Sequence, residues 1–163
     1  MPAAAMAAIW FIFYGKATTF YGVDSNPEAI RALGFNTSNF RVETLDQMTF
    51  FDAFCDVVIS SAVLHFARDD RDFDSMLRGT WRVLKPGGLF FCRLASSIGI
   101  ENQVKQISGR RFLLPDGSER YLVDENLLMH LTADLGGQLA DPLKTTVVQN
   151  QRSMTTWVVR KNH

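Results

Sequence analysis

Two apolar segments on either side of one helical pattern constrain this chain more than any other feature. Asp56–Leu64 and Leu89–Leu94 are apolar runs that do not alternate with polar residues as a half-exposed strand would. Between them Phe73, Leu77 and Trp81 recur at four-residue steps, which is the spacing of a helix with one buried face. A strand, an amphipathic helix and a second apolar strand predict a βαβ crossover in a parallel sheet. The sequence therefore predicts an α/β fold.

The charges around this helix support its boundaries. Aspartates gather at its start, and Arg78, Arg82 and Lys85 lie near its end, an arrangement that suits the helix macrodipole. Pro86–Gly88 then stops the helix, because proline cannot continue it and glycine can turn the chain. We expect the helix over Asp72–Leu84.

Length and composition limit the domain count and the partners. A chain of 163 residues has room for one domain and one sheet, so we expect a single domain over residues 1–163. Its 17 acidic residues balance 17 basic ones, which gives no electrostatic reason for a nucleic-acid or membrane partner. Cys55 and Cys92 lie at or in apolar strand segments, so we expect buried, reduced thiols and a cytoplasmic protein.

The first segment allows two structures. Ala3–Tyr14 is wholly apolar, but no basic residue precedes it, as a signal peptide requires, and it is shorter than the roughly 20 residues of a membrane span. Its alanines and the following glycine favour a buried helix that ends at Gly15. The alternative is a strand over Ile9–Tyr14, because this part is aromatic and β-branched, with Gly15–Lys16 as a hairpin turn.

Local signals predict the remaining elements. Asn26 is a good N-cap and Pro27 a good first helical residue, so we expect a short helix over Pro27–Leu33. Asp124 opens another helix in the same way. We expect parallel strands at Thr18–Val23, Arg41–Glu43, Cys55–Ser60 and Leu89–Leu94, and an antiparallel C-terminal hairpin of Lys144–Val148 and Met154–Arg160.

Three motifs carry a resemblance to a known family. Tyr21–Pro27, Cys55–Phe66 and Trp81–Gly88 stand in the order and spacing of class I S-adenosylmethionine-dependent methyltransferases, and the chain is similar to their small-molecule branch, which includes the tellurite-resistance methyltransferases. The resemblance implies a Rossmann-like methyltransferase sheet, mostly parallel with a C-terminal antiparallel hairpin. It also implies S-adenosyl-L-methionine as cofactor and a small molecule as methyl acceptor.

The resemblance assigns the adenosine half of the cofactor site to two segments. Asp24, followed by Ser25, ends the second strand. A carboxylate at this place can accept hydrogen bonds from both ribose hydroxyls of the cofactor, because it has acceptor oxygens only. The loop with Leu45 and Asp46 corresponds to the segment that borders the adenine. The family often has an acidic residue where Thr44 stands here. Without a cofactor role, Asp24 would be a helix-capping or turn aspartate, and the loop with Leu45 and Asp46 would be a solvated surface loop.

The segment after the fourth strand is expected along the methionine part of the cofactor. In related enzymes the residues that correspond to Ser61, Ala62 and His65 lie there and form the floor of the substrate pocket. His65 is a weak candidate for a general base and otherwise a hydrogen-bonded structural histidine. A strong base is not required, because alignment of a nucleophile with an electrophilic sulfonium methyl group supplies much of the rate.

One departure from the family concerns the start of the chain. The first strand and the glycine-rich loop of these enzymes are missing, since the loop would fall at about Met1–Ala5 and no GxGxG occurs anywhere. We therefore expect an N-terminally incomplete domain, whose unpaired strand edges promote self-association unless Ile9–Tyr14 or another chain fills the gap. We also expect weak binding of S-adenosylmethionine.

Two functions remain open from the sequence. The first is methyl transfer to a small molecule, and the alternative is a non-catalytic methyltransferase-like protein for binding or assembly. Specificity would be set by the irregular stretch Ser96–Tyr121. Its basic pair, Arg110 and Arg111, suits either an anionic substrate or a solvated loop.

Overall fold

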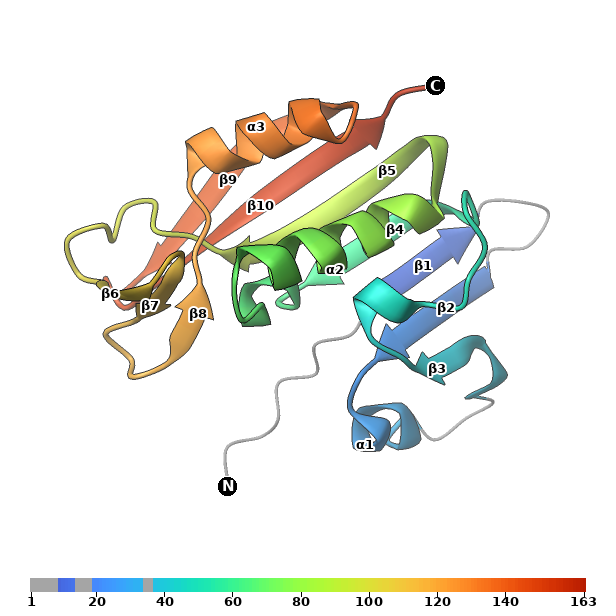
Figure 1. Cartoon of the computed structure of the whole chain (residues 1–163), viewed down its shortest axis with the longest axis horizontal. Coiled ribbons are helices and arrows are strands. Elements are labelled where there is room, and N and C mark those ends of the chain that lie inside the picture. Colours follow the sequence, from blue (N-terminus) through green and yellow to red (C-terminus); the bar gives the residue numbers. More distant parts are fainter. Residues whose placement is uncertain (1–8, 14–18, 34–36) are drawn as a thin grey trace.

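A seven-stranded mixed sheet forms the centre of the computed structural model, which describes residues 9–13, 19–33 and 37–163 (Figure 1). Its strand order is β3-β2-β1-β4-β5-β10-β9. The strands are β1 (Ile9–Phe13), β2 (Thr19–Asp24), β3 (Phe40–Val42), β4 (Cys55–Ser61), β5 (Leu84–Ala95), β9 (Gly137–Val148) and β10 (Arg152–Lys161). The helices are α1 (Pro27–Arg31), α2 (Asp70–Val83) and α3 (Glu125–Asp134), with 3-10 turns η1 (Thr37–Asn39), η2 (Leu45–Gln47) and η3 (Leu64–Phe66).

The strand directions confirm the α/β class. β2 pairs in parallel with β3, and β4 with β5, while β10 is antiparallel to both β5 and β9. The expected C-terminal hairpin is therefore present. β1 is antiparallel to both of its neighbours, so the sheet is more mixed than expected, although five of its seven strands still run in one direction.

The helix prediction for the first segment is wrong where the structure describes it. Ile9–Phe13 is a strand, as the alternative interpretation held, and it lies between β2 and β4. Ile9 is opposite both Val23 and Ser60. The reason is tertiary, because a strand here forms ladder hydrogen bonds with two open sheet edges that a helix would leave unpaired. The rest of Ala3–Tyr14 and the Gly15–Lys16 turn lie outside the described residues.

This strand also changes the prediction of unpaired edges. The edges of β2 and β4 that face each other are both paired with β1. The gap in the sheet is thus filled from within the chain, and these two edges no longer give a reason for association. Self-association stays a prediction.

Helix α2 forms as its sequence pattern predicts. Asp69 caps it by accepting a hydrogen bond from the amide of Asp72 at 2.8 Å. Phe73, Leu77 and Trp81 are buried along its inner face, and the Trp81 ring meets that of Phe90 on β5 edge to face at 6.3 Å. Truncating a fully buried leucine of this kind costs about 2–5 kcal/mol.

The two long helices cover one face of the sheet (Figure 1). On this face Val58, Phe90 and Trp157 are fully buried beneath α2 and α3. Ile59 and Phe91, which alternate with them and point to the other face, remain partly exposed. The hydrophobic core therefore lies between the sheet and the α2–α3 layer.

A small antiparallel sheet stands beside the start of α2. It consists of β6 (Lys105–Ser108), β7 (Arg111–Leu113) and β8 (Glu119–Tyr121) (Figure 1). Tyr121 stacks on Phe73 with ring centroids 4.5 Å apart, and its hydroxyl donates to Asp70 at 2.8 Å. These contacts hold the end of the Ser96–Tyr121 stretch, which the sequence analysis expected to set specificity, against the start of α2.

Both cysteines are buried free thiols, as expected. Burial raises the pKa of the Cys55 and Cys92 thiols to about 12, so both are protonated and unreactive at neutral pH. Across the described residues, no helix has the length and apolar character needed to cross a bilayer.

Candidate functional site

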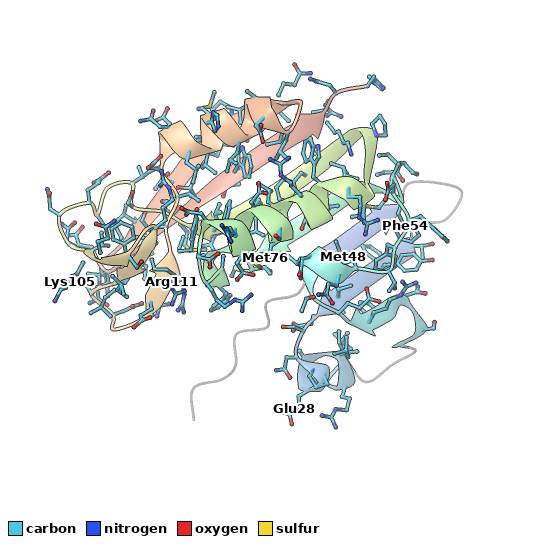
Figure 2. All side chains as sticks on the ribbon, viewed as in Figure 1. Glu28, Met48, Phe54, Met76, Lys105 and Arg111 are labelled. Atoms are coloured by element: carbon cyan, nitrogen blue, oxygen red, sulfur yellow. The ribbon has the colours of Figure 1, made fainter. Side chains whose placement is uncertain are left out.

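A cleft of about 570 Å³ lies at the carboxyl end of β2, between the η2 turn and α2. Its volume is in the range of small-molecule sites. The end of β2, the η2 turn, the segment after β4 and the first half of α2 line it. Figure 2 labels Met76, which lines the cleft from α2, and Met48, which is buried at the end of η2. The position agrees with the rule that ligands of open α/β sheets bind at the carboxyl ends of strands.

Asp24 is a buried polar group of the cleft. It is only 8% exposed, and its Oδ1 accepts a hydrogen bond from the amide of Asn26 at 2.8 Å. Asn26 in turn caps α1 through the amide of Glu28 at 2.9 Å. Within the described part of the chain Oδ2 accepts no hydrogen bond from protein, so this carboxylate has acceptor capacity left for a ligand.

The η2 turn closes the other side of the cleft, and Gly79 of α2 allows its position. Leu45, Asp46 and Thr44 line the cleft, with Leu45 buried beneath. A Cβ atom on Gly79 would lie 2.0 Å from the carbonyl oxygen of Leu45, so only glycine fits this approach of helix and turn. Sequence reasoning missed this residue, although an isolated glycine inside a helical pattern was the available signal.

Glu43 also lines the cleft and was not predicted. Its carboxylate accepts from the amide of Thr49 at 3.0 Å and from the Thr49 hydroxyl at 2.5 Å. Arg41 lies 3.9 Å from the same carboxylate. Glu43 therefore holds the ends of the η2 segment together and has less capacity for a ligand than Asp24.

Arg68 and Asp72 form the outer wall of the cleft, and they too were missed. The guanidinium donates to both carboxylate oxygens of Asp72, Nε to Oδ2 and Nη2 to Oδ1, each at 3.0 Å. These hydrogen bonds lower the pKa of Asp72 below its usual value and raise that of Arg68. Their spacing of four residues was the sequence signal for the pair.

Ser61, Ala62 and His65 lie at the end of β4 and in the turn that follows, but they do not line the cleft. Val63 and Phe66 of the same segment do. The structure thus brings Asp24 together with Ser25 and the η2 residues in one cleft. Ser61, Ala62 and His65, which we expected along the methionine part of the cofactor, are not among the residues that line this cleft. Their role in cofactor binding stays a prediction.

The surroundings of His65 favour a structural histidine. It is 5% exposed, and its Nδ1 accepts from the amide of Ala95 at 3.1 Å. Burial, followed by the positive charges of Arg120 and Arg93, lowers the pKa of His65 to about 4. The neutral ring therefore carries its proton on Nε2, which leaves no free lone pair to accept a proton from a substrate.

The Asp24 carboxylate and Leu45 of η2 both line this cleft, and the contacts expected from them with a ribose and an adenine stay a prediction. Ile9, at the amino end of β1, is the residue of that strand nearest this edge, because it pairs with Val23 and Ser60. The residues that precede Ile9 lie outside the described residues. Over the part of the chain that is described, no group of His, Cys, Asp and Glu could hold a metal ion.

Comparisons with known proteins agree with this architecture. Residues 4–92 match the protein-family model described as a methyltransferase domain. No curated protein matches the chain.

Among solved structures, the chain is similar to an S-adenosylmethionine-dependent methyltransferase from Methanosarcina mazei, with 20% identity and a TM-score of 0.70, over 86% of this chain and 80% of that one. It is also similar to the 1,6-didemethyltoxoflavin-N1-methyltransferase of Burkholderia thailandensis, with 15% identity, a TM-score of 0.64 and coverage of 86% and 60%. A third is the N-methyltransferase NodS of Bradyrhizobium japonicum, with 14% identity, a TM-score of 0.63 and coverage of 86% and 65%. The last two were solved with S-adenosylhomocysteine. The chain spans less than two thirds of their length, and likenesses at these identities show the fold.

Proposed function

Because the chain belongs to the methyltransferase domain family, whose cofactor is S-adenosylmethionine, we propose that it binds this cofactor in the cleft beside Asp24 and methylates a small molecule. The structural relatives support the choice of cofactor, since two of them hold S-adenosylhomocysteine. One of those two also holds a small heteroaromatic acceptor, 1,6-didemethyltoxoflavin, which supports a small-molecule acceptor for this chain.

The observation that carries the proposal is the carboxylate of Asp24. It is nearly buried, held at one oxygen by the amide of Asn26, and aligned on a cleft of ligand size. The second carboxylate oxygen accepts no hydrogen bond from the described residues, and the two adjacent hydroxyls of a ribose are donors that this carboxylate could accept from. A hydrogen bond to a charged group contributes about 1.5–3 kcal/mol.

Transfer itself requires alignment more than acid–base chemistry. The bound cofactor would supply an electrophilic methyl group on a sulfonium sulfur. The chain would hold the ribose through Asp24 and border the base through Leu45, and Phe66 lines the cleft on the side of β8. These contacts would align the methyl group with a lone pair of the acceptor, and a proton that the acceptor carries would leave to solvent. His65 does not act as a base in this step, because its Nδ1 accepts from the amide of Ala95 and its Nε2 carries the ring proton.

A second candidate function is a nucleoside-binding protein without methyl transfer, and the missing glycine-rich loop favours it. The sequence holds no GxGxG, and where the resemblance places that loop, at Met1–Ala5, Pro2 has no amide donor and alanine methyl groups replace glycine hydrogens. Two lost hydrogen bonds would weaken S-adenosylmethionine binding by roughly 10²–10⁴ and leave an adenosine fragment less affected.

Isothermal titration with S-adenosylhomocysteine and 5′-methylthioadenosine separates the two functions. The proposal requires that both ligands bind and that Asp24→Ala weakens both. Asp141→Ala on β9, which lies outside the cleft, is the control. Formation of S-adenosylhomocysteine from S-adenosylmethionine with a panel of small acceptors then tests transfer. Binding that Asp24→Ala leaves unchanged would disprove the proposed site, whereas binding of both ligands without any transfer would favour the nucleoside-binding function.

A further inference from the structure

Arg82, in the last turn of α2, reaches from the helix to the segment that follows the η2 turn. Its Nη1 donates to the carbonyl oxygen of Phe50 at 2.8 Å and to Oδ1 of Asp52 at 2.7 Å. Its Nη2 donates to the carbonyl oxygen of Met48 at 2.8 Å. The sequence analysis placed this arginine only among the charges that suit the helix macrodipole. In the structure its guanidinium also binds the backbone of a segment that lies 32 to 34 residues earlier.

The two carbonyl groups belong to the stretch that leads from η2 to β4. The three residues of η2, Leu45–Gln47, all line the cleft and are called the η2 wall below. Met48 directly follows this wall, and both Met48 and Phe50 are buried. Residues 48–54 form neither helix nor strand, so their backbone groups need partners from elsewhere. A guanidinium suits this need, because it presents several N–H donors in fixed directions.

One side of α2 faces the η2 wall along much of the helix. At its start this side borders the ligand space, and further along Gly79 allows the carbonyl oxygen of Leu45 to approach the helix. Steps of four, three and three residues place four residues along this side, namely Asp72, Met76, Gly79 and Arg82. Asp72 and Met76 line the cleft. A change at Arg82 therefore acts on the cleft through the η2 wall.

A separate network holds the same segment from the side of β3. The amide of Thr49, which lies between the two carbonyls that Arg82 binds, donates to Oε2 of Glu43 at 3.0 Å. Arg41 donates from Nη1 to the Thr49 hydroxyl at 2.6 Å, and its guanidinium carbon lies 3.9 Å from the centre of the Phe50 ring. Glu43 itself lines the cleft. Arg82 and Glu43 thus hold successive residues of one segment from two sides.

Arg78, one turn earlier in α2, binds a different kind of partner. Its guanidinium donates to the carboxylates of Asp74 at 2.9 Å and Asp134 at 2.6 Å, and none of these three residues lines the cleft. Arg82 also has a carboxylate partner in Asp52, but that side chain is 79% exposed, so solvent screens the ion pair. The contacts that distinguish Arg82 are therefore those with the two backbone carbonyls.

We propose that Arg82 is a positioning residue, which sets the η2 wall for a bound nucleoside through its hydrogen bonds to the carbonyls of Met48 and Phe50. This inference rests on the proposed function. Arg82 is not among the residues that line the cleft, so it acts through the backbone that it binds. It holds the η2 wall in place before the ligand binds, and the ligand then does not have to order this turn.

The test uses Arg82→Met, with Arg78→Met and Asp52→Asn as controls. Methionine keeps an unbranched stem and a good helix propensity but removes every donor. Arg78→Met loses the same charge from the same helix, and Asp52→Asn removes the ion pair while it leaves the carbonyl contacts in place. Each variant is unfolded in urea, and each is titrated calorimetrically with 5′-methylthioadenosine at a temperature at which circular dichroism shows that it is folded.

Amide signals in NMR spectra of the free protein report on the η2 wall without a ligand. The amide of Gln47 donates to the N-cap carbonyl of η2 at 3.1 Å, and that of Gly117 donates to the carbonyl of Leu114 at 2.9 Å in the turn between β7 and β8. Arg82→Met should shift the signals of Gln47 and Thr49 and leave that of Gly117 at its wild-type position.

We expect Arg82→Met to bind 5′-methylthioadenosine about tenfold more weakly than Arg78→Met, and Asp52→Asn to bind it like wild type. A purely structural role predicts that Arg82→Met unfolds at lower urea but binds the ligand like its control, and this result would overturn the proposal. Equal weakening by Asp52→Asn would also overturn it, as would an unmoved Gln47 signal. If wild type binds no nucleoside, the proposed function fails, and the Gln47 and Thr49 signals alone decide whether Arg82 positions the η2 wall.

Discussion

Replacing Gly79 with alanine tests whether the η2 turn and α2 meet as closely as the structure requires. The new Cβ atom would lie 2.0 Å from the carbonyl oxygen of Leu45, 2.9 Å from its carbonyl carbon and 3.2 Å from the Cα of Asp46. All three are backbone atoms, so no side-chain rotation relieves the clash. The turn must move away from the helix by about an ångström or more to reach ordinary contact, and its three residues, which all line the cleft, move with it.

Two opposing energies set the size of the effect. Alanine is favoured over glycine inside a helix by about 1 kcal/mol, so a Gly79 without close neighbours would make the variant more stable. Overpacking in a well-packed region costs typically about 1–3 kcal/mol, and a clash with backbone belongs at or above the upper end of that range. The difference is about 2 kcal/mol or more, so we expect Gly79→Ala to lower the free energy of unfolding by at least about 2 kcal/mol and to weaken nucleoside binding.

Urea unfolding and calorimetric titration with 5′-methylthioadenosine provide the two measurements. Ser75→Ala is the control, because it improves helix propensity at an exposed position of the same helix. We expect the control to gain a few tenths of a kcal/mol and to bind the ligand normally. If Gly79→Ala were as stable as the control and bound the ligand like wild type, the close approach of helix and turn would be refuted.

The other predictions concern binding, packing and pH. Asp24→Ala should weaken binding of S-adenosylhomocysteine and 5′-methylthioadenosine alike, by about 10- to 100-fold in isothermal titration, because it removes the acceptor for the ribose. S-adenosylmethionine should bind with a dissociation constant weaker than micromolar, and a tighter value would show that residues before β1 complete the site. Trp157→Phe should cost about 1–3 kcal/mol in urea unfolding, because the buried indole donates to the Thr132 hydroxyl at 2.9 Å and the change leaves that hydroxyl without its donor. His65 should lower the free energy of unfolding in acid, because its pKa of about 4 in the folded state lies below the value near 6.5 of the unfolded state. The unfolded state therefore binds the proton first, and the free energy of unfolding falls by up to about 3 kcal/mol as the pH drops from 6.5 to 4. His65→Asn, which keeps an acceptor for the Ala95 amide, should show a flatter dependence of the urea midpoint on pH over that range; an equally steep one would contradict this assignment.

The sequence by itself determined the elements whose signals are local. The four-residue steps of Phe73, Leu77 and Trp81 predicted a helix over Asp72–Leu84, and α2 runs from Asp70 to Val83. The apolar runs gave β4 and β5, and the Asn26–Pro27 cap gave α1. Such features can be read because a buried helical face repeats every three to four residues and a cap depends on the next three amides. The position of Asp24 at the end of β2 followed in the same way.

Tertiary structure alone decided the rest. Ile9–Phe13 has residues suited to either a helix or a strand. Two open sheet edges, contributed by residues as far along the chain as Ser60, made it a strand. The need for glycine at position 79 comes from a turn more than 30 residues earlier. The sequence likewise marks Arg110 and Arg111 as a basic pair, but the structure pairs them with the carboxylates of Asp124 and Glu119. Local periodicity specifies which face of an element is buried, whereas pairing across the chain decides what that element meets and which charges remain for a ligand.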